Sequence, residues 1–168
     1  CVTGSNGKTT LKEWLKETLK NNFLVYSNPG NFNNLIGMPI TLVNIPKNTE
    51  ICILELGMNT YGEIKELARI ARPDIAIITN IGNAHIGNFK NRFEIAKEKS
   101  DIFSFLEGDS IAIIPGDSDH FKLLDKKAKA KTNQIITFGK DPDFQSKYKE
   151  EKNDMFTFNV SETKIKLK

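Results

Sequence analysis

Near its N-terminus the chain reads Gly4-Ser5-Asn6-Gly7-Lys8-Thr9-Thr10, a glycine-containing loop between a short apolar segment and a helical pattern. Backbone N–H groups of such a loop, together with the N-terminus of the following helix, can surround a polyphosphate. Lys8 would then reach the β- and γ-phosphates, and the Thr9 hydroxyl would bind Mg²⁺. The usual pattern has glycine where this chain has Val2, so a tight turn with a solvated Lys8 is the alternative. The stretch favours nucleotide binding by all seven residues, Gly4, Ser5, Asn6, Gly7, Lys8, Thr9 and Thr10.

Strand and helix patterns alternate outward from this loop. The i, i+3, i+4 spacing of Leu11, Trp14 and Leu15 predicts a helix with these residues buried and its Lys and Glu side chains exposed. Alternating strands and helices imply an α/β fold, a mostly parallel sheet of the P-loop type flanked by helices, whose strands end along one functional edge. We expect helices at 9–21, 62–72, 92–106 and 120–130, strands at 23–26, 51–56, 75–81, 110–114 and 134–138, a loop at 27–39, and a small antiparallel β hairpin from 155–160 and 163–167.

Length and composition limit the possible functions. With 168 residues, 39% hydrophobic and 27% charged, the chain offers about one globular domain and is not disordered. A net charge of +3 is too balanced for nucleic-acid binding through bulk electrostatics, and no apolar run is long enough for a membrane helix. Two cysteines are too few for a disulfide framework, so we expect a cytoplasmic protein. Both ends of the chain are expected to be cuts in a longer protein.

Two further side chains are expected at the same sheet edge as the loop. Glu55 follows the apolar run 51–54, and a carboxylate that leaves a buried strand beside a phosphate loop can hold Mg²⁺ directly or through water. His85 follows the next buried strand and can bind a metal as neutral imidazole. A solvent-exposed carboxylate and an ordinary loop histidine are the alternatives. His120, at the start of a helix, is expected to be incidental.

Lys99 falls within the apolar stripe of the helix predicted over 92–106. It stands four residues after Ile95 and four before Phe103. Burial of an unpaired ammonium lowers its pKa, so a neutral, nucleophilic amine becomes accessible. Such an amine can add CO₂ to form a carbamate, whose negative charge would organise a second Mg²⁺. The alternative is a lysine that extends from the edge of the stripe to water.

In this order the motifs resemble those of the central ATP-binding domain of the Mur ligases, most of all the MurF type. The similarity runs from Thr3 to about Gly139. In the family's loop the extra glycine stands at the position of Gly4, which explains why this chain has Val2 where the usual phosphate-loop pattern has glycine. Thr60-Tyr61 departs from the family, where many relatives have His-Pro or Lys-Pro, and no motif is recognisable from 141 onward. The resemblance rests on residues 3–10 (TGSNGKTT), 31–39 (NFNNLIGMP), 55–59 (ELGMN), 80–85 (NIGNAH) and 95–99 (IAKEK).

The resemblance implies an ATP-dependent amide ligase of peptidoglycan precursor synthesis. In the MurF type, D-alanyl-D-alanine is added to a UDP-N-acetylmuramoyl tripeptide through an acyl phosphate. The implied cofactors are ATP and Mg²⁺, and the implied catalytic residues are Lys8, His85 and Lys99. The implied metal ligands are Thr9, Glu55, His85 and Lys99, the last as the lysine that is carbamylated in several family members.

Other functions remain open at this point. Another Mur-type ligase, MurE-like or cyanophycin-synthetase-like, is compatible with the motifs, because specificity is decided mostly in other domains. A P-loop module that binds nucleotide without ligation is a second alternative, and a P-loop kinase or GTPase lacks support from base-specificity or lid motifs. We expect residues 1–168 to be the central domain alone, without the N-terminal UDP-substrate domain and the C-terminal ligase domain. We further expect little ligation by this domain alone, a monomer, and neither nucleic-acid binding nor membrane insertion.

Overall fold

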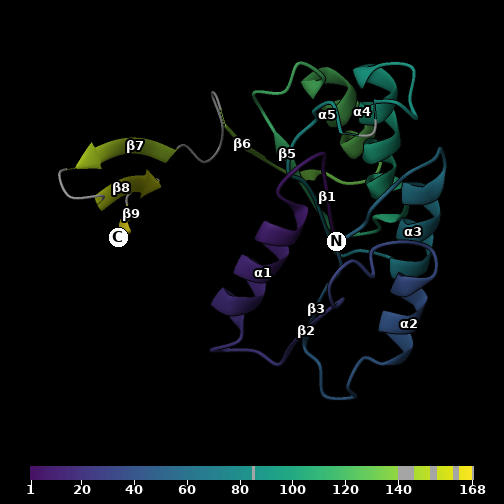
Figure 1. Ribbon diagram of the computed structural model, residues 1–168, viewed down its shortest axis with the longest axis horizontal. Coiled ribbons are helices and arrows are strands. Elements are labelled where there is room, and N and C mark those ends of the chain that lie inside the picture. The colour runs from purple at the N-terminus through teal and green to yellow at the C-terminus, as the bar shows by residue number, and fades with distance from the viewer. Residues whose placement is uncertain (85, 140–145, 152–154, 161–162, 168) are drawn as a thin grey trace.

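Figure 1 shows the computed structural model, which describes residues 1–84, 86–139, 146–151, 155–160 and 163–167. Strands and helices alternate through most of the chain, and the predicted α/β class is confirmed. The elements are β1 (Val2–Thr3), α1 (Lys8–Leu19), β2 (Val25–Ser27), α2 (Gly37–Val43), β3 (Ile51–Ile53), α3 (Glu63–Ala71), β4 (Ile75–Ile78), α4 (Arg92–Ser100), a 3₁₀ helix η1 (Asp101–Phe105), β5 (Ile111–Pro115), α5 (Phe121–Lys129), β6 (Gln134–Phe138), β7 (Ser146–Glu151), β8 (Met155–Val160) and β9 (Thr163–Leu167).

The parallel strands follow the order β2-β3-β1-β4-β5-β6. Parallel pairing joins β1, β4, β5 and β6 on one side and β2 with β3 on the other. A parallel bridge between Val2 and Glu55 connects the two groups, where Val2 N donates to Leu54 O and Leu56 N donates to Val2 O, each at 2.8 Å. The chain runs outward from β1 to β2 and later crosses β1 to reach β4. This reversal creates a crevice at the carboxyl ends of β1, β3 and β4, where open α/β sheets bind ligands.

Helices cover both faces of the sheet. In Figure 1, α1 lies on one side of the strands and α3 on the other, as right-handed crossovers on either side of the reversal require. Helix α1 packs on β1, β2 and β3, whereas α3, α4, η1 and α5 pack against one another. The core lies between this second helical layer and the sheet. It includes Ile78 and Ile114 from the strands, Ile64 and Leu67 from α3, and Ile95, Ile102 and Phe103 from α4 and η1.

The buried face predicted for the first helix is partly wrong. Trp14 is 68% exposed, whereas Lys12, expected on the solvent side, is 0% exposed. At about 100° per residue, Leu11, Lys12, Leu15 and Leu19 share one side of α1, and Trp14 lies about 60° beyond Leu11. The buried face of α1, which packs on β1–β3, is therefore rotated about the helix axis relative to the predicted face, and it includes Lys12.

Three smaller predictions are also corrected. The stretch 27–39, expected to be a loop, already contains the start of α2, and Pro39 is tolerated there because it stands in the first turn. The helix predicted over 92–106 is α4 followed by the tighter turn of η1. The small antiparallel sheet has three strands in the order β7-β8-β9, with β7 added to the predicted hairpin.

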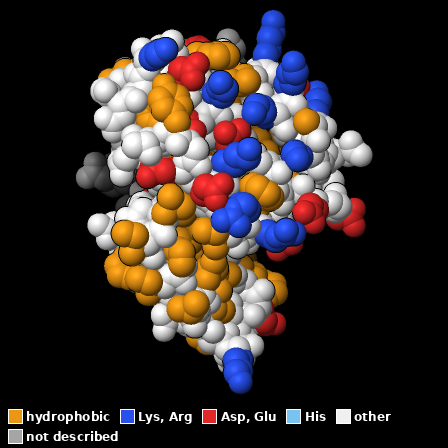
Figure 2. All heavy atoms as spheres, turned by 90° about the vertical axis from the view of Figure 1, so that its right-hand side faces the viewer, with side chains coloured by type: hydrophobic (Ala, Val, Ile, Leu, Met, Phe, Trp, Pro, Cys, Tyr) orange, Lys and Arg blue, Asp and Glu red, His pale blue; other side chains and the backbone are white. Residues whose placement is uncertain are grey.

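Helix α2 exposes an apolar face. Figure 2 shows hydrophobic side chains gathered over the lower part of the face on which α2 lies, below a band of Lys and Arg. The exposed hydrophobic residues on and just before this helix are Leu35, Ile36, Ile40 and Val43. Met38 and Thr41 are buried on its other side. Across the described ranges, the structure contains no helix of the length and hydrophobicity that crossing a membrane requires.

Candidate active site

The loop between β1 and α1 presents free N–H groups at a helix N-terminus. Gly7, with a φ of 78°, turns the chain into α1, and none of the described side chains caps this helix. The first bond of the helix runs from Leu11 N to Gly7 O at 2.9 Å, so the N–H groups of Lys8, Thr9 and Thr10 precede it. An added Cβ at Gly7 would contact nothing within 4 Å. The arrangement suits an anion placed directly against the backbone.

The segment after β4 holds this loop in place. Ser5 N donates to Asn80 O at 3.1 Å, and Asn6 N donates to Asn80 Oδ1 at 3.0 Å. Thr79 Oγ1 donates to Asn6 O at 2.6 Å, and Ser5 Oγ accepts from Gly82 N at 2.8 Å. Ser5 and Asn6, both expected to bind nucleotide, thus use these groups to fix the shape of the loop, and the N–H groups of residues 8–10 stay free.

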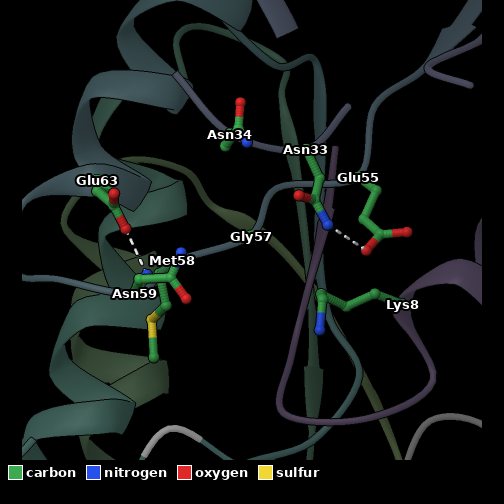
Figure 3. A pocket seen from close by; sticks show the side chains of 8 residues that line it. All are labelled: Lys8, Asn33, Asn34, Glu55, Gly57, Met58, Asn59 and Glu63. Atoms are coloured by element: carbon green, nitrogen blue, oxygen red, sulfur yellow. Dashed lines mark hydrogen bonds between the residues drawn. The ribbon is translucent and has the colours of Figure 1, made fainter. Parts of the chain in front are cut away.

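Glu55 is buried at the carboxyl end of β3, beside the loop. Its side chain is 2% exposed, which contradicts the alternative of a solvent-exposed carboxylate. Oε2 accepts a hydrogen bond from Thr9 Oγ1 at 2.7 Å, and Oε1 accepts one from Asn33 Nδ2 at 2.8 Å. Figure 3 shows Glu55 and Asn33 joined in this way, with Lys8 beside them. The predicted proximity of Thr9 and Glu55 is therefore observed.

Two lysines from different helices share one acceptor in the loop. Lys8 Nζ and Lys99 Nζ each donate to Gly4 O at 3.0 Å, so the two nitrogens are at most twice that distance apart. Lys99 is 1% exposed, which excludes a side chain that extends to water, and its other polar contact is Met58 Sδ at 3.8 Å. Burial, reinforced by the neighbouring Lys8 charge, lowers the pKa of Lys99 to about 7. A large fraction of neutral amine is therefore present at neutral pH.

The residue before Lys99 connects α4 to α3. Glu98 accepts from Gly62 N at 2.8 Å and from Ile64 N at 3.0 Å, and so satisfies the free N–H groups at the start of α3. Burial raises the pKa of this carboxyl group, although the two N–H donors oppose the shift. Consecutive residues of α4 thus contact α3 and the loop.

A cavity of about 150 Å³ opens beside these groups. Figure 3 shows its lining side chains, which come from α1, the segment before α2, the segment after β3, and α3. On its far side Glu63 accepts from the N–H groups of Asn59 and Thr60, the latter at 2.9 Å. The lining residues are Lys8, Asn33, Asn34, Glu55, Gly57, Met58, Asn59 and Glu63.

The structure brings together most of the predicted site residues. Gly4, Lys8, Thr9, Glu55 and Lys99 meet at the carboxyl ends of β1 and β3. His85 lies outside the described residues, so its role as a metal ligand stays a prediction. Sequence reasoning missed Asn28 and Asn33 as functional residues, although the asparagine-rich segment 28–34 was a signal, and it also missed Lys12.

The donors in this site fit magnesium and a polyphosphate. A hydroxyl and a carboxylate oxygen, from Thr9 and Glu55, are hard ligands of the kind that Mg²⁺ takes from proteins. Within the described ranges no three His, Cys, Asp or Glu residues gather to hold a metal. A complete protein cage is unnecessary, because Mg²⁺ is commonly bound by one or two protein groups together with phosphates and water.

Comparison with protein families and known proteins agrees with this geometry. The model of the Mur ligase middle domain matches residues 2–168. The chain belongs to this family. The chain is 47% identical over 116 residues to the UDP-N-acetylmuramoyl-tripeptide--D-alanyl-D-alanine ligase of Bacillus subtilis, covering 69% of this chain and 25% of that one. The same ligase of Rickettsia prowazekii is 42% identical over 139 residues, or 82% of this chain and 31% of its own.

Solved structures of Mur ligases share the fold of this middle domain. MurF from Acinetobacter baumannii superimposes with a TM-score of 0.89 at 32% identity, over 99% of this chain and 37% of that chain. MurF ligase from Thermotoga maritima, determined in complex with ADP, gives a TM-score of 0.84 at 33% identity, over 99% of this chain and 39% of that chain. The Mur ligase middle domain described here thus spans about a quarter to two fifths of the relatives it matches.

Proposed function

We propose that the chain is the nucleotide-binding domain of an ATP-dependent ligase of peptidoglycan precursor synthesis. The ligase would add D-alanyl-D-alanine to a UDP-N-acetylmuramoyl tripeptide, as the names of the Bacillus subtilis and Rickettsia prowazekii relatives state for those proteins. One observation carries the proposal: the uncapped N-terminus of α1, Lys8, the Thr9–Glu55 pair and Lys99 converge on one edge of the sheet. The substrates need further domains of the ligase, which would act in the cytoplasm.

The proposed reaction has two steps. A carboxylate oxygen of the tripeptide attacks the γ-phosphorus of ATP, an O–P bond forms, and the bond to the β,γ-bridging oxygen breaks to release ADP. The amine of D-alanyl-D-alanine then attacks the acyl carbon, phosphate leaves with the C–O electron pair, and the nitrogen loses a proton. Phosphorylation supplies the leaving group that makes amide formation favourable.

The residues of the loop would bind and stabilise the transferring phosphoryl group. The N–H groups of residues 8–10 face the phosphates, and Lys8 exchanges its bond to Gly4 O for a phosphate oxygen. Thr9 and Glu55 would hold Mg²⁺, which supplies positive charge against the phosphate oxygens when bound. Asn33 keeps the Glu55 carboxylate turned toward Thr9.

Lys99 would act as a carbamate. The ammonium first loses a proton, and the neutral amine then attacks CO₂, so that an N–C bond forms and a second proton is released. These two steps together replace a cation by an anion beside the phosphate site. The pKa of about 7 and the short reach to the loop support this role. His85 is proposed as a further metal ligand.

The decisive experiment is phosphate release by the ligase that contains this chain, assayed with UDP-N-acetylmuramoyl tripeptide and a panel of amines. We expect D-alanyl-D-alanine to be the preferred amine. Replacing Lys8 with Ala should lower turnover by about a thousandfold, because charge stabilisation in phosphoryl transfer depends on such groups. Lys20→Ala, at the exposed end of α1, is the matched control and should be near wild type. Full activity of Lys8→Ala would contradict the proposal.

A further inference from the structure

Lys12 is completely buried one turn beyond Lys8 on the helix that opens the phosphate site. It is 0% exposed, and its Nζ donates to Asn28 O at 2.8 Å and pairs with Glu13 Oε1 at 3.1 Å. Burial of a lysine costs free energy unless its donors are satisfied, and a hydrophobic residue would fill the same space at lower cost. The position therefore calls for an explanation beyond packing.

The partner of Lys12 holds the backbone of Glu55. The buried side chain of Asn28 accepts from Glu55 N at 2.8 Å through Oδ1 and donates to Glu55 O at 3.2 Å through Nδ2. Both main-chain polar groups of Glu55 are thus bound by a single amide. The place and direction from which the Glu55 side chain leaves β3 depend on where Asn28 sits.

Asn28 also fixes the segment that supplies the second partner of the Glu55 carboxylate. Its Nδ2 donates to Phe32 O at 2.9 Å, directly before Asn33, whose amide reaches Glu55 Oε1. Asn33 is held in turn by Gly57 N, which donates to its carbonyl oxygen at 2.7 Å. One asparagine therefore sets both the origin of the Glu55 side chain and the position of a group that orients its end.

This series of hydrogen bonds begins and ends on α1. Lys12 and Thr9 are three residues apart and so lie on the same side of the helix. From Lys12 the contacts pass to Asn28, then to Glu55, and from its Oε2 back to Thr9. Moving Asn28 relative to α1 would therefore change the distance between the Thr9 hydroxyl and the Glu55 carboxylate.

We infer that Lys12 is a positioning residue, which acts through Asn28 to hold the Glu55 carboxylate against Thr9. The inference rests on the proposed function only in taking Thr9 and Glu55 as the oxygen ligands of the magnesium ion. Lys12 is not among the residues that line the cavity, and the partners of its Nζ among the described residues are Asn28 and Glu13, so its effect is expected in the requirement for the metal rather than in nucleotide binding.

The first test needs no activity. In ¹H–¹⁵N spectra of the protein without nucleotide, Lys12→Met should shift the side-chain amide signals of Asn33 in the same direction as Glu55→Gln, because both weaken the Asn33–Glu55 hydrogen bond. Lys20→Met, the same change at the exposed residue that follows α1, should leave these signals in place. Unchanged Asn33 signals in a folded Lys12→Met protein would overturn the inference, even if no ligase activity were ever found.

The second test measures the Mg²⁺ concentration that gives half-maximal phosphate release at saturating ATP. Groups that orient metal ligands typically change metal affinity ten- to a hundredfold, so Lys12→Met should raise this concentration about tenfold while the KM for ATP stays within about twofold. Added to Glu55→Gln, the same substitution should have less than about a twofold further effect, because the carboxylate it positions is gone. An equal effect in both backgrounds would show a merely structural role and overturn the inference.

A second variant covers the case in which Lys12→Met does not fold. Asn28→Asp keeps the acceptor for Glu55 N but loses the donor to Glu55 O and Phe32 O. It should raise the Mg²⁺ requirement in the same way, and an unchanged requirement would count against the inference. A wild-type ligase without magnesium-dependent phosphate release would refute the proposed function instead, and the Asn33 signals would still decide the role of Lys12.

Discussion

Helices α1 and α4 each bury a lysine, and the two lysines have different surroundings. Lys12 on α1 has a carbonyl oxygen and a carboxylate as partners. Lys99 on α4 has one carbonyl oxygen, a sulfur atom and the charged side chain of Lys8 nearby. Each side chain is at most 1% exposed, so burial alone does not distinguish them.

The difference indicates what each amine can do. A buried amine whose donors face a carboxylate and a carbonyl group is well suited to hold other residues in place. Among the described residues Lys99 has no anionic partner at its Nζ, and its pKa falls to about 7, so it is suited to react. In the roles proposed for them, Lys12 positions a metal ligand and Lys99 supplies a nucleophile.

The largest expected effect is on turnover, and it distinguishes Lys99 from Lys12. Lys99→Met removes the reactive amine and should lower kcat by about a thousandfold at any Mg²⁺ concentration, since it abolishes charge placed for the transferring phosphoryl group. Lys12→Met should instead be rescued by added Mg²⁺. Steady-state phosphate release over a magnesium titration measures both, and rescue of Lys99→Met by magnesium alone would remove the distinction.

The pH dependence of stability tests the state of Lys99. Its pKa falls from 10.5 to about 7 in the folded protein. Between these values the unfolded chain carries a proton on Lys99 that the folded chain lacks, so this residue makes the free energy of unfolding rise with pH. Lys99→Met removes the dependence. The free energy of unfolding of Lys99→Met minus that of the wild type should be largest at or below pH 7, and it should fall by roughly 3 kcal/mol by about pH 9.5.

Urea denaturation in buffers free of CO₂ gives this difference, because without CO₂ the carbamate cannot form. Lys12→Met, measured in parallel, provides the comparison at the other buried lysine. A Lys99→Met difference that stayed constant over this range would mean that the folded protein keeps Lys99 charged.

A smaller effect is expected from the acceptor that Lys99 shares with Lys8. Gly4 has a φ of 153°, and an added Cβ would lie 1.8 Å from Thr79 Oγ1. Gly4→Ala should destabilise the protein by about 2 kcal/mol more than Gly7→Ala, where φ is also positive but the space is open. Thermal unfolding measures the difference. Equal destabilisation would show that Thr79 moves aside freely, so that the Gly4 carbonyl need not hold Lys99 rigidly.

Local patterns predicted the fold and the centre of the site. The loop Gly4–Thr10 depends on residues that are adjacent in sequence, and parallel strand order then placed Glu55 beside Thr9. Lys99 was found because its spacing from Ile95 and Phe103 is set by the helix itself. In these cases the determining interactions are short in sequence or follow from topology.

Other features depend on contacts that no local pattern contains. Lys12 was expected in solvent because the apolar residues of α1 suggested a buried face that includes Trp14, whereas the strands beneath the helix decide which side is buried. The roles of Asn28 and Asn33 arise from hydrogen bonds to Glu55, which is 27 and 22 residues away. Such partners become visible only when the strands are assembled.

The adjacent residues Glu98 and Lys99 connect α4 to two different parts of the molecule. Glu98 accepts hydrogen bonds from the first turn of α3, and Lys99 donates to the carbonyl oxygen of Gly4. Helix α3 also supplies Glu63 to the wall of the cavity, so α4 connects this wall to the phosphate loop. We expect a ligand that displaces Glu63 to displace Gly4 as well, because α4 contacts both α3 and the loop.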